Sequence, residues 1–519
     1  MSSRGWSVPK LRRMAFLGCV SLGGCAGPGT FHMDSEAPPR ITIPDAEELE
    51  VQTASAEEAP KPKPPTPFEL PPGLPGAQTP PIIPPKFTPD TPAAERQRMV
   101  RELYPARPEK GDGSSNFATG DQVSLQVLLD MAYQSSPAIR KAQANAEAAS
   151  GSVIQAGLAP NPTAGYQADQ WVSRVGKADG ANPNSGQQGA YYNQTFKFPG
   201  KLSLAQAVAG FDFMNAQVAV RRSKVDLAGQ VRTAYFSAIV AQQSVETNAT
   251  LLQLLNETYE LQLKQVAGGE AAGYEPLQLY AQSVQAKNNL TQAENAAKNA
   301  WRQLTSAIGV PDLKPMALSG KADAVAPVFD QDALLKRTLD WHTDVVTAKN
   351  SFDQAQVNVR LQRITPYPDL IANTVVQHDN ALGNNQFNLQ FGITLPLFDR
   401  NQGNIKQALG QLRASQENIL QTQNTLRGQF AEAYFRYETN RVIAVSYRDK
   451  ILPNLMRAYR AIIRRYQVEP DKVSFNDIVT AQQNLVTALQ AHLAALDAQW
   501  KALTDLANTA QLDELEFGK

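Results

Sequence analysis

Residues 201–266 limit the possible folds more than any other part of the chain. The stretch contains no proline and only two glycines, and its apolar residues recur at steps of three and four, the spacing of one helical face. Since a helix rises 1.5 Å per residue, the stretch predicts a helix roughly 100 Å long. A compact globular core does not need a helix of that length.

A second stretch of the same kind covers residues 401–467 and is free of proline up to Pro453. Both stretches carry the tripeptide Ala-Tyr-Phe, at residues 234–236 and 433–435, about 200 residues apart. Further pairs match at a similar spacing: Leu128-Leu129 with Leu334-Leu335, Pro160-x-Pro162 with Pro366-x-Pro368, and Ala281-Gln282 with Ala481-Gln482. The chain from about residue 121 to 510 is therefore two copies of one unit.

The same order of elements is predicted in both copies. A helix of middling length comes first, at residues 124–158 and 330–364, and ends at a Pro-x-Pro break. Two short strands and the long helix follow. A short loop then leads into a third helix, at residues 276–308 and 475–507.

The short segments before each long helix alternate between apolar and polar residues. Every second residue from Phe387 to Leu397 is apolar, with Asn388 and Gln390 among the residues in between. This period of two predicts a strand with one apolar face. Residues 192–198 show the same pattern, and residues 370–376 and 164–168 show it less strongly. Each segment is about ten residues long, which is the length of a tilted transmembrane β-strand.

Two interpretations of these strands are open. One strand alone favours a half-buried sheet in a soluble protein, whereas four strands beside helices of about 100 Å favour a membrane-spanning sheet. Four strands cannot close a barrel, and an open sheet edge is not tolerated in lipid. The membrane interpretation therefore requires oligomerisation, and three copies give twelve strands, an even number within the usual range.

The N-terminus is predicted to be a lipoprotein signal. Basic residues up to Arg13 precede a short apolar run, and Leu22-Gly23-Gly24 leads into Cys25. This pattern predicts cleavage after residue 24 and acylation of Cys25, the first residue of the mature chain. Cys19 fits the pattern less well and would leave with the signal. The alternative is a plain signal peptide with an incidental cysteine.

The predicted domain boundaries follow from these patterns. Residues 25–118 hold more than half of the chain's 35 prolines, which predicts a disordered linker behind the lipid anchor. Residues 119–310 and 328–511 are the two copies. Residues 311–327, with several prolines and a glycine, form an inter-repeat linker, and residues 512–519 form a short acidic tail.

The composition excludes several classes of function. The formal net charge is zero, so no basic surface indicates nucleic-acid binding. The four histidines are scattered, without a second histidine three or four residues away, and no phosphate-binding loop is present. No apolar run reaches 18 residues, so no transmembrane helix is predicted. The sequence predicts neither an enzyme nor a bound metal or cofactor.

Two tandem copies of helix, strand pair, long helix and helix behind a lipoprotein signal resemble the TolC outer-membrane efflux family. The turn Pro160-Asn161-Pro162 and the sequence Phe198-Pro199-Gly200-Lys201 before the long helix resemble the cation-efflux branch of the CzcC type. The resemblance covers residues from about 121 to 510. The proline-rich segment is unusually long for this family.

The resemblance implies a homotrimer in the outer membrane. Its fold would be mainly α with a transmembrane β-barrel: twelve strands cross the outer membrane, and a long α-helical barrel extends through the periplasm. It would dock on a periplasmic adaptor (membrane fusion protein) and an inner-membrane pump of the RND type, and it would contact outer-membrane lipid.

The ends of the two long hairpins are the candidate sites. In the family these ends form the periplasmic aperture and meet the adaptor. The candidate residues are Gly268, Gly269, Glu270, Gly273 and Tyr274 in the first turn and Glu469, Pro470, Asp471 and Lys472 in the second. Small residues there would allow helices to converge, and glycine permits a tight turn. The alternative is that these are ordinary hairpin turns.

Charges near the ends are a further hypothesis. Carboxylates such as Glu469 and Asp477 could form acidic rings in an oligomer, which would favour cations. Arg464 and Arg465 lie close to the second turn and could pair with these carboxylates to hold a gate shut. The alternative is that these charges are solvated faces of helices.

Three hypotheses about function remain open. The first is the outer-membrane channel of a tripartite efflux system for small substrates such as metal cations or drugs. The second is the outer-membrane channel of a type I protein secretion system. The third is a structural lipoprotein that spans the periplasm without a pore, which the alternating face of residues 387–397 argues against.

Overall fold

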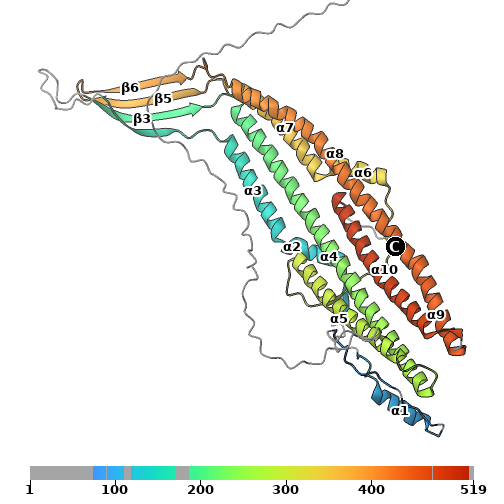
Figure 1. The fold of residues 1–519 in the computed structure, drawn as a ribbon. Coiled ribbons are helices and arrows are strands. Elements are labelled where there is room, and N and C mark those ends of the chain that lie inside the picture. The colour runs from blue at the N-terminus through green and yellow to red at the C-terminus, as the bar shows by residue number, and fades with distance from the viewer. Residues whose placement is uncertain are drawn as a thin grey trace, which may run out of the picture. The chain divides into compact units, whose positions relative to one another are not determined.

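The computed structural model describes residues 74–83, 85–88, 90–109, 118–169, 186–469 and 472–512 (Figure 1). The chain divides into two units, residues 1–80 and 81–519, and every helix and strand described below belongs to the second. The predicted signal with Cys25, the second-turn residues Pro470 and Asp471, and the tail after Leu512 lie outside the described residues.

The same order of elements occurs twice along the chain, as the repeat predicts. The first copy consists of α2 (Leu125–Ser135), α3 (Pro137–Gly157), β2 (Thr163–Asp169), β3 (Gln187–Phe196), α4 (Lys201–Gly268) and α5 (Glu275–Ile308). The second consists of α6 (Gln331–Trp341), α7 (Thr343–Ile364), β5 (Leu370–Asp379), β6 (Asn384–Ile393), α8 (Gln402–Ser446), the π-helix η1 (Tyr447–Ile451), α9 (Leu452–Val468) and α10 (Phe475–Thr509). The long helix of the first copy therefore matches its prediction within two residues at its end.

The first helix of each copy is broken, and the prediction of one continuous helix is wrong in both. Ser136 separates α2 from α3 with an extended backbone (ψ 119°), because the ring of Pro137 disfavours a helical conformation in the residue before it. His342 separates α6 from α7 with ψ 135°. Its Nδ1 accepts a hydrogen bond from the amide of Asp344 at 3.2 Å and so caps α7.

The second long helix runs from α8 through η1 to α9 and changes from an α-helix to a π-helix and back. Residues 447–451 form a π-helix directly before α9, and Pro453 lies in the first turn of α9. A proline inside a helix removes one backbone hydrogen bond and clashes with the preceding turn. A local π segment at such a position accommodates the irregularity while the helix continues.

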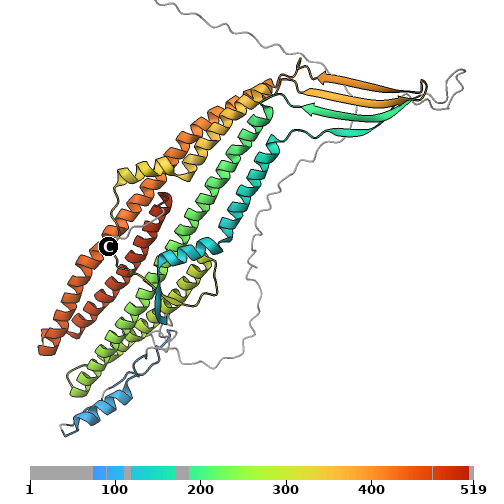
Figure 2. The ribbon, with the colours of Figure 1, turned by 180° about the vertical axis from the view of Figure 1, so that it is seen from behind.

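Helix α4 is the central element of the packing. It contacts α3, α5, α7 and α10 along its length, and α7 and α10 in turn contact α8 (Figures 1 and 2). Nearly every turn of α4 from Val225 onward contributes buried side chains to these contacts. No helix in the described ranges combines the length and the hydropathy that crossing a bilayer requires.

The main core lies where the two copies meet the inter-repeat linker. Phe236 of α4 stacks on Trp500 of α10 with ring centroids 4.3 Å apart. The indole N–H of Trp500 donates to the carbonyl of Ala322 at 2.7 Å, and that of Trp301 donates to Leu313 at 3.0 Å. The two tryptophans occupy equivalent places in the two copies, and both attach the linker to the core.

The Ala-Tyr-Phe motifs have the same role. The hydroxyl of Tyr235 donates to the carbonyl of Ser319 in the linker, and the hydroxyl of Tyr434 donates at 3.1 Å to the carbonyl of Phe329, two residues after the linker ends. The linker also forms strand β4 (Met316–Leu318), which pairs in parallel with β1 (Ala118–Val123). This small two-stranded sheet was not predicted from the sequence.

One part of the predicted proline-rich linker is structured, so the prediction of disorder is wrong there. Residues Ala93–Leu103 form helix α1, which contacts α4. The stretch between Pro92 and Pro105 contains no proline, and Val100 and Tyr104, four residues apart, are 0% and 4% exposed. The apolar side of this short helix is therefore covered by the body of the molecule.

Candidate functional site

The four long strands form one antiparallel sheet in the order β2-β3-β5-β6 (Figure 1). The central pair, β3 and β5, joins the two copies, with Gln187 opposite Asp379 and Phe196 opposite Leu370. Among the described residues β2 and β6 are the outer strands, and each has one edge without a partner strand. The sheet is therefore open on both sides.

One face of the sheet is apolar and exposed. Tyr166, Ala190, Val376 and Phe387 lie opposite one another across the four strands, so they share a face. Tyr166 is 67% exposed and Phe387 is 68% exposed, and Phe391 further along β6 is 66% exposed. An exposed apolar face that extends over four strands indicates a surface covered by lipid or by another protein.

The other face of the sheet is lined with amides. Gln167, Gly189, Gln377 and Gln386 form one row across the strands. Gln386 donates to Asp379 at 3.2 Å, as Gln187 does from the neighbouring strand. The strands thus have one apolar and one hydrophilic face, as the alternation predicts.

A charged cluster fixes the sheet to the long helices. Asp369, directly before β5, accepts hydrogen bonds from Lys197 and Lys201 at 2.9 Å each and from the amide of Phe198 at 2.9 Å. Burial alone would raise the pKa of Asp369, but these donors lower it to about 2. The carboxylate is therefore ionised throughout the physiological pH range, and it holds the start of α4 against the start of β5.

The first turn, residues 269–274, begins with a left-handed glycine. Gly269 has φ 79° and ends α4, and the amide of Glu270 returns to the carbonyl of Gln265 at 2.9 Å. Glu270 is exposed, and Tyr274 is 62% exposed. The predicted candidates of this turn therefore lie together at one end of the α4–α5 hairpin.

The first turn is also fixed by hydrogen bonds to side chains. Gln262 of α4 donates to the carboxylate of Glu275, the first residue of α5. Burial raises the pKa of this carboxyl, and its two hydrogen-bond donors partly offset the effect. The hydroxyl of Tyr104 donates to the carbonyl of Gly273 at 2.7 Å.

The second turn is fixed by a different device. Ser474 and Asp477 form a capping box at the start of α10, in which each side chain accepts from the backbone amide of the other. The hydrogen bonds from Ser474 lower the pKa of Asp477. Asp477, predicted as a gate charge, thus caps its own helix in this structure.

The remaining predicted gate charges are at the surface. Arg465 and Lys472 both face Glu469, at 3.6 Å and 3.3 Å. Arg464 is exposed. Arg465 therefore pairs with a carboxylate four residues later at the same helix end, and the role of these charges in a gate stays a prediction.

The two hairpins touch close to their turns. The hydroxyl of Tyr466 on α9 donates to Gln265 of α4 at 2.7 Å, and Gln482 of α10 donates to Thr258 of α4 at 2.9 Å. Tyr466 is 8% exposed, and burial raises the pKa of its hydroxyl. The structure therefore brings the two predicted turn regions together.

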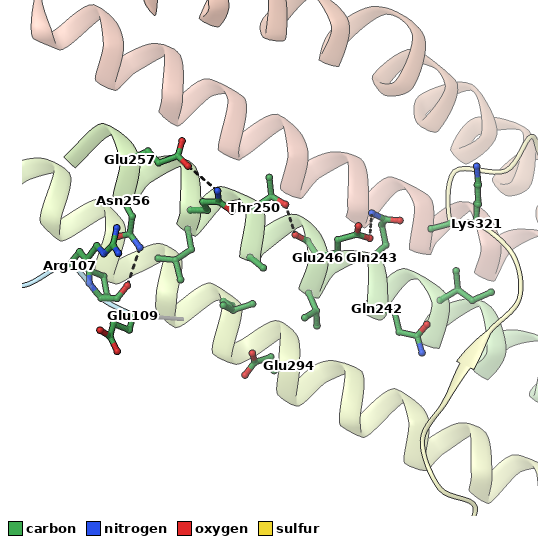
Figure 3. A pocket seen from close by; sticks show the side chains of 18 of the residues that line it. Arg107, Glu109, Gln242, Gln243, Glu246, Thr250, Asn256, Glu257, Glu294 and Lys321 are labelled. Atoms are coloured by element: carbon green, nitrogen blue, oxygen red, sulfur yellow. Dashed lines mark hydrogen bonds between the residues drawn. The ribbon is translucent and has the colours of Figure 1, made fainter. Parts of the chain in front are cut away.

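A cavity of about 930 Å³ lies beside α4, between residues 107–109 and the linker residues 320–322. Its charged lining includes Glu246, Glu257, Glu294 and Lys321 (Figure 3). In this view Glu257 and Glu294 point away from each other. Among the described residues, no group of three or more His, Cys, Asp or Glu side chains is placed to hold a metal ion.

A comparison with known protein families identifies the family of this chain. The family described as "Outer membrane efflux protein" matches residues 128–310 and 334–510, which are the two copies of the repeat. The chain belongs to the outer membrane efflux protein family. The resemblance inferred from the sequence is thereby confirmed, and the family is one of outer-membrane efflux channels.

Two metal-resistance proteins are relatives of this efflux protein. It is 23% identical over 384 residues to the cobalt-zinc-cadmium resistance protein CzcC of Cupriavidus metallidurans, with 74% of this chain and 89% of the relative covered. It is 27% identical over 306 residues to the nickel-cobalt-cadmium resistance protein NccC of Alcaligenes xylosoxydans xylosoxydans, with 56% and 65% covered.

Solved channel structures share the fold of this efflux protein. CusC aligns with a TM-score of 0.63 at 16% identity, covering 78% of this chain and 99% of CusC. VceC of Vibrio cholerae aligns with a TM-score of 0.60 at 18% identity, covering 74% and 95%. The MtrE outer membrane channel of Neisseria gonorrhoeae aligns with a TM-score of 0.61 at 18% identity, covering 78% and 97%.

The sequence analysis did not predict the contacts between the segment around Pro105 and the first hairpin of this efflux protein. The hydroxyl of Tyr259 donates to the carbonyl of Pro105 at 2.7 Å. Burial, the neighbouring carboxylate of Glu260 and nearby tyrosines raise the pKa of Tyr259 to about 12. The only signal in the sequence was the proline-free interval from residue 93 to 104, which is too short to predict its packing.

Proposed function

We propose that three copies of this protein form the outer-membrane channel of a tripartite efflux system. The open four-stranded sheet with one exposed apolar face carries the proposal. In lipid the unpaired edges of β2 and β6 must be satisfied, and the β6 edge of one chain pairing with the β2 edge of the next does so. Three sheets close into a barrel of twelve strands.

The helices supply the second half of the channel. Helix α4 has 68 residues, so it is roughly 100 Å long. Three sets of hairpins side by side form a hollow helical barrel that extends from the membrane through the periplasm. The first turn at residues 268–275 and the flanking residues of the second turn, Glu469 and 472–474, lie at the end remote from the sheet. There the two turns form the aperture and the contact with the periplasmic adaptor and the inner-membrane pump.

The cargo is a small substrate, and metal cations are the class that the two metal-resistance relatives support. The amide-lined face of the sheet suits a hydrated ion. Neutral amides can form hydrogen bonds to the water around the ion, and they do not bind the ion itself as a charged group would. The exposed carboxylate of Glu469 would favour cations, and Asp471, two residues later in the sequence, adds a second negative charge. If neutralising Glu469 and Asp471 leaves ion selectivity unchanged, this role of the carboxylates is wrong.

Acylation of Cys25 anchors the mature chain in the outer membrane. The signal-like residues before Cys25 support this part of the proposal. Mass spectrometry of the mature N-terminus tests it directly. Replacement of Cys25 by serine removes the acyl chains, whereas the barrel alone still requires detergent for extraction.

A type I protein secretion channel is the alternative within the same fold, and no observation in the structure favours it. A structural lipoprotein without a pore is the alternative outside it. Such a protein has no reason to expose Phe387 and Phe391 on a sheet whose opposite face is hydrophilic.

Single-channel recording in planar bilayers tests the proposed function. Phe391→Arg places a charge on the apolar face, which costs about 2–4 kcal/mol per chain near the centre of a bilayer and should abolish insertion. Gln390→Arg, its neighbour on the hydrophilic face, is the matched control and should leave discrete conductance steps. Equal behaviour of the two variants would mean that the sheet does not face lipid.

A further inference from the structure

Residues 93–109, which we name the N-terminal strap, lie along the first hairpin close to its turn. Its residues Val100 and Tyr104 are 0% and 4% exposed and belong to one apolar cluster with Tyr259, Leu263 and Leu279 of the hairpin. Helix α1, the first part of the strap, lies beside the end of α4 and α5 in both views (Figures 1 and 2). This part of the predicted disordered linker thus belongs to the structure around the candidate aperture.

Polar contacts fasten the strap at several levels of the hairpin. The side-chain amide of Asn256 donates to the carbonyl of Pro108 at 3.0 Å, and Lys287 of α5 donates to the carbonyl of Glu109. Arg101 pairs with Glu260 at 3.4 Å. The strap therefore binds one side of the hairpin over several helical turns.

One of these contacts reaches the turn itself. Tyr104 donates its hydroxyl hydrogen bond to the carbonyl of Gly273, inside the turn. The turn from Gly268 to Gly273 is made of small residues with one glutamate, Glu270, which is exposed. Such a turn has few side chains with which to hold its own position, so a hydrogen bond from outside has a large share in placing it.

The binding surface of the strap is small enough for release. Of the eleven residues of α1, Val100 is the buried one, and Arg98, Arg101 and Glu102 are exposed. The ion pair of Arg101 is itself largely solvated, with 61% of the arginine side chain exposed. The buried apolar contacts of the strap are thus those of Val100 and Tyr104, and a few hydrogen bonds add to them.

We propose that the strap is a latch that holds the first turn in its resting position and must shift when the aperture opens. This inference rests on the proposed channel function. In the part of the chain that the structure describes, the strap contacts the first turn, whereas the second turn has its own capping box.

The test uses one variant that loosens the latch and one that locks it. Tyr104→Phe keeps the ring and removes the hydrogen bond to Gly273, and loss of one such bond should raise the open fraction in planar bilayers about three- to tenfold. Arg101→Cys with Glu260→Cys, joined by a short thiol cross-linker, should lower the open fraction. Leu103→Ala, on the partly exposed side of α1, and the two single-cysteine variants are the controls.

A second readout separates the latch from the channel. Hydrogen exchange at residues 270–275 reports on the turn whether or not the protein conducts, and Tyr104→Phe should accelerate it while Leu103→Ala should not. If Tyr104→Phe and the cross-linked variant both conduct with the open fraction of the wild type, the latch is overturned and the proposed channel function stands. If neither the wild type nor any variant conducts, the proposed channel function fails, and hydrogen exchange alone then tests the latch. Unchanged exchange at residues 270–275 in Tyr104→Phe overturns the latch. Faster exchange there supports the strap as a restraint on the turn.

Discussion

The two long hairpins come from two copies of one sequence unit, yet they are completed differently. In the first, α4 continues for 68 residues without a break and ends at a left-handed glycine, and the N-terminal strap covers the end. In the second, α8 and α9 are joined through a π-helix, and the turn ends in a capping box. A shared apolar period therefore fixes the length and packing of the hairpins, while each turn is stabilised by its own local residues.

The largest expected effect tests whether the two copies contribute equally to the core. Trp301→Ala and Trp500→Ala should each lower the free energy of unfolding by about 3–5 kcal/mol. Trp500→Ala should lower it by about 1 kcal/mol more, because it also loses the stacking on Phe236. Denaturant titration followed by circular dichroism measures the difference, and a larger loss in Trp301→Ala would contradict the account.

The next effect concerns the first turn. Gly269→Ala should lower the free energy of unfolding by about 1–2 kcal/mol, since φ 79° is unfavourable for a residue with a Cβ atom. Gly268→Ala is the matched control, because it lies inside α4, where alanine is favoured over glycine. The prediction is wrong if both substitutions shift the unfolding midpoint in the same direction.

A slightly smaller effect is expected at the second turn. Ser474→Ala removes the acceptor for the amide of Asp477 and should lower the free energy of unfolding by about 1 kcal/mol. Ser474→Thr, which keeps the acceptor, should be close to the wild type. If Ser474→Ala is also silent, the second turn is held by something other than its capping box.

The smallest effect depends on pH and distinguishes the helix breaks of the two copies. Burial, with Arg222 nearby, lowers the pKa of His342 below 6.5, although Asp344 and Asp226 oppose the shift. Because the folded pKa is lowered, this residue contributes stability above about pH 6.5 that is lost as the pH falls further, when the cap of α7 must accept a proton. At the equivalent break of the first copy, Ser136 caps α3 without titrating.

Replacing His342 with asparagine keeps a side-chain acceptor and removes the titration. The variant should lose less stability than the wild type between neutral and mildly acidic pH, measured by the unfolding midpoint. Ser136→Ala should lower the midpoint by the same amount at every pH in this range. An unchanged pH dependence in His342→Asn would show that the cap is not the acid-sensitive group.

The features predicted from the sequence are those that a repeated local pattern determines. The period of α4 and the alternation from Phe387 to Ile393 determine the type of element and the face on which each side chain lies, because both follow from a residue's position in the repeat. The break at His342 was missed because no proline or glycine marks it in the sequence. The break at Ser136 was marked by Pro137, since a proline disfavours a helical conformation in the residue before it, and the apolar period on both sides was given too much weight.

The missed contacts depend on residues far apart in the chain. Strand β1 pairs with β4 almost 200 residues later, and Tyr104 reaches Gly273 from a segment whose composition indicates disorder. No local pattern encodes either pairing, because each depends on which surface the finished hairpins leave uncovered. The candidate turn residues were found from their place in the repeat, and the strap that fixes the first turn was not.

The central claim is that the open sheet closes by assembly of three chains. Native mass spectrometry of the detergent-extracted protein tests it most directly, because it counts the chains in one particle. The account predicts three chains, and it predicts that Phe391→Arg no longer yields this particle while Gln390→Arg does. A monomer that stays in solution without detergent after removal of the acylated N-terminus would contradict the account.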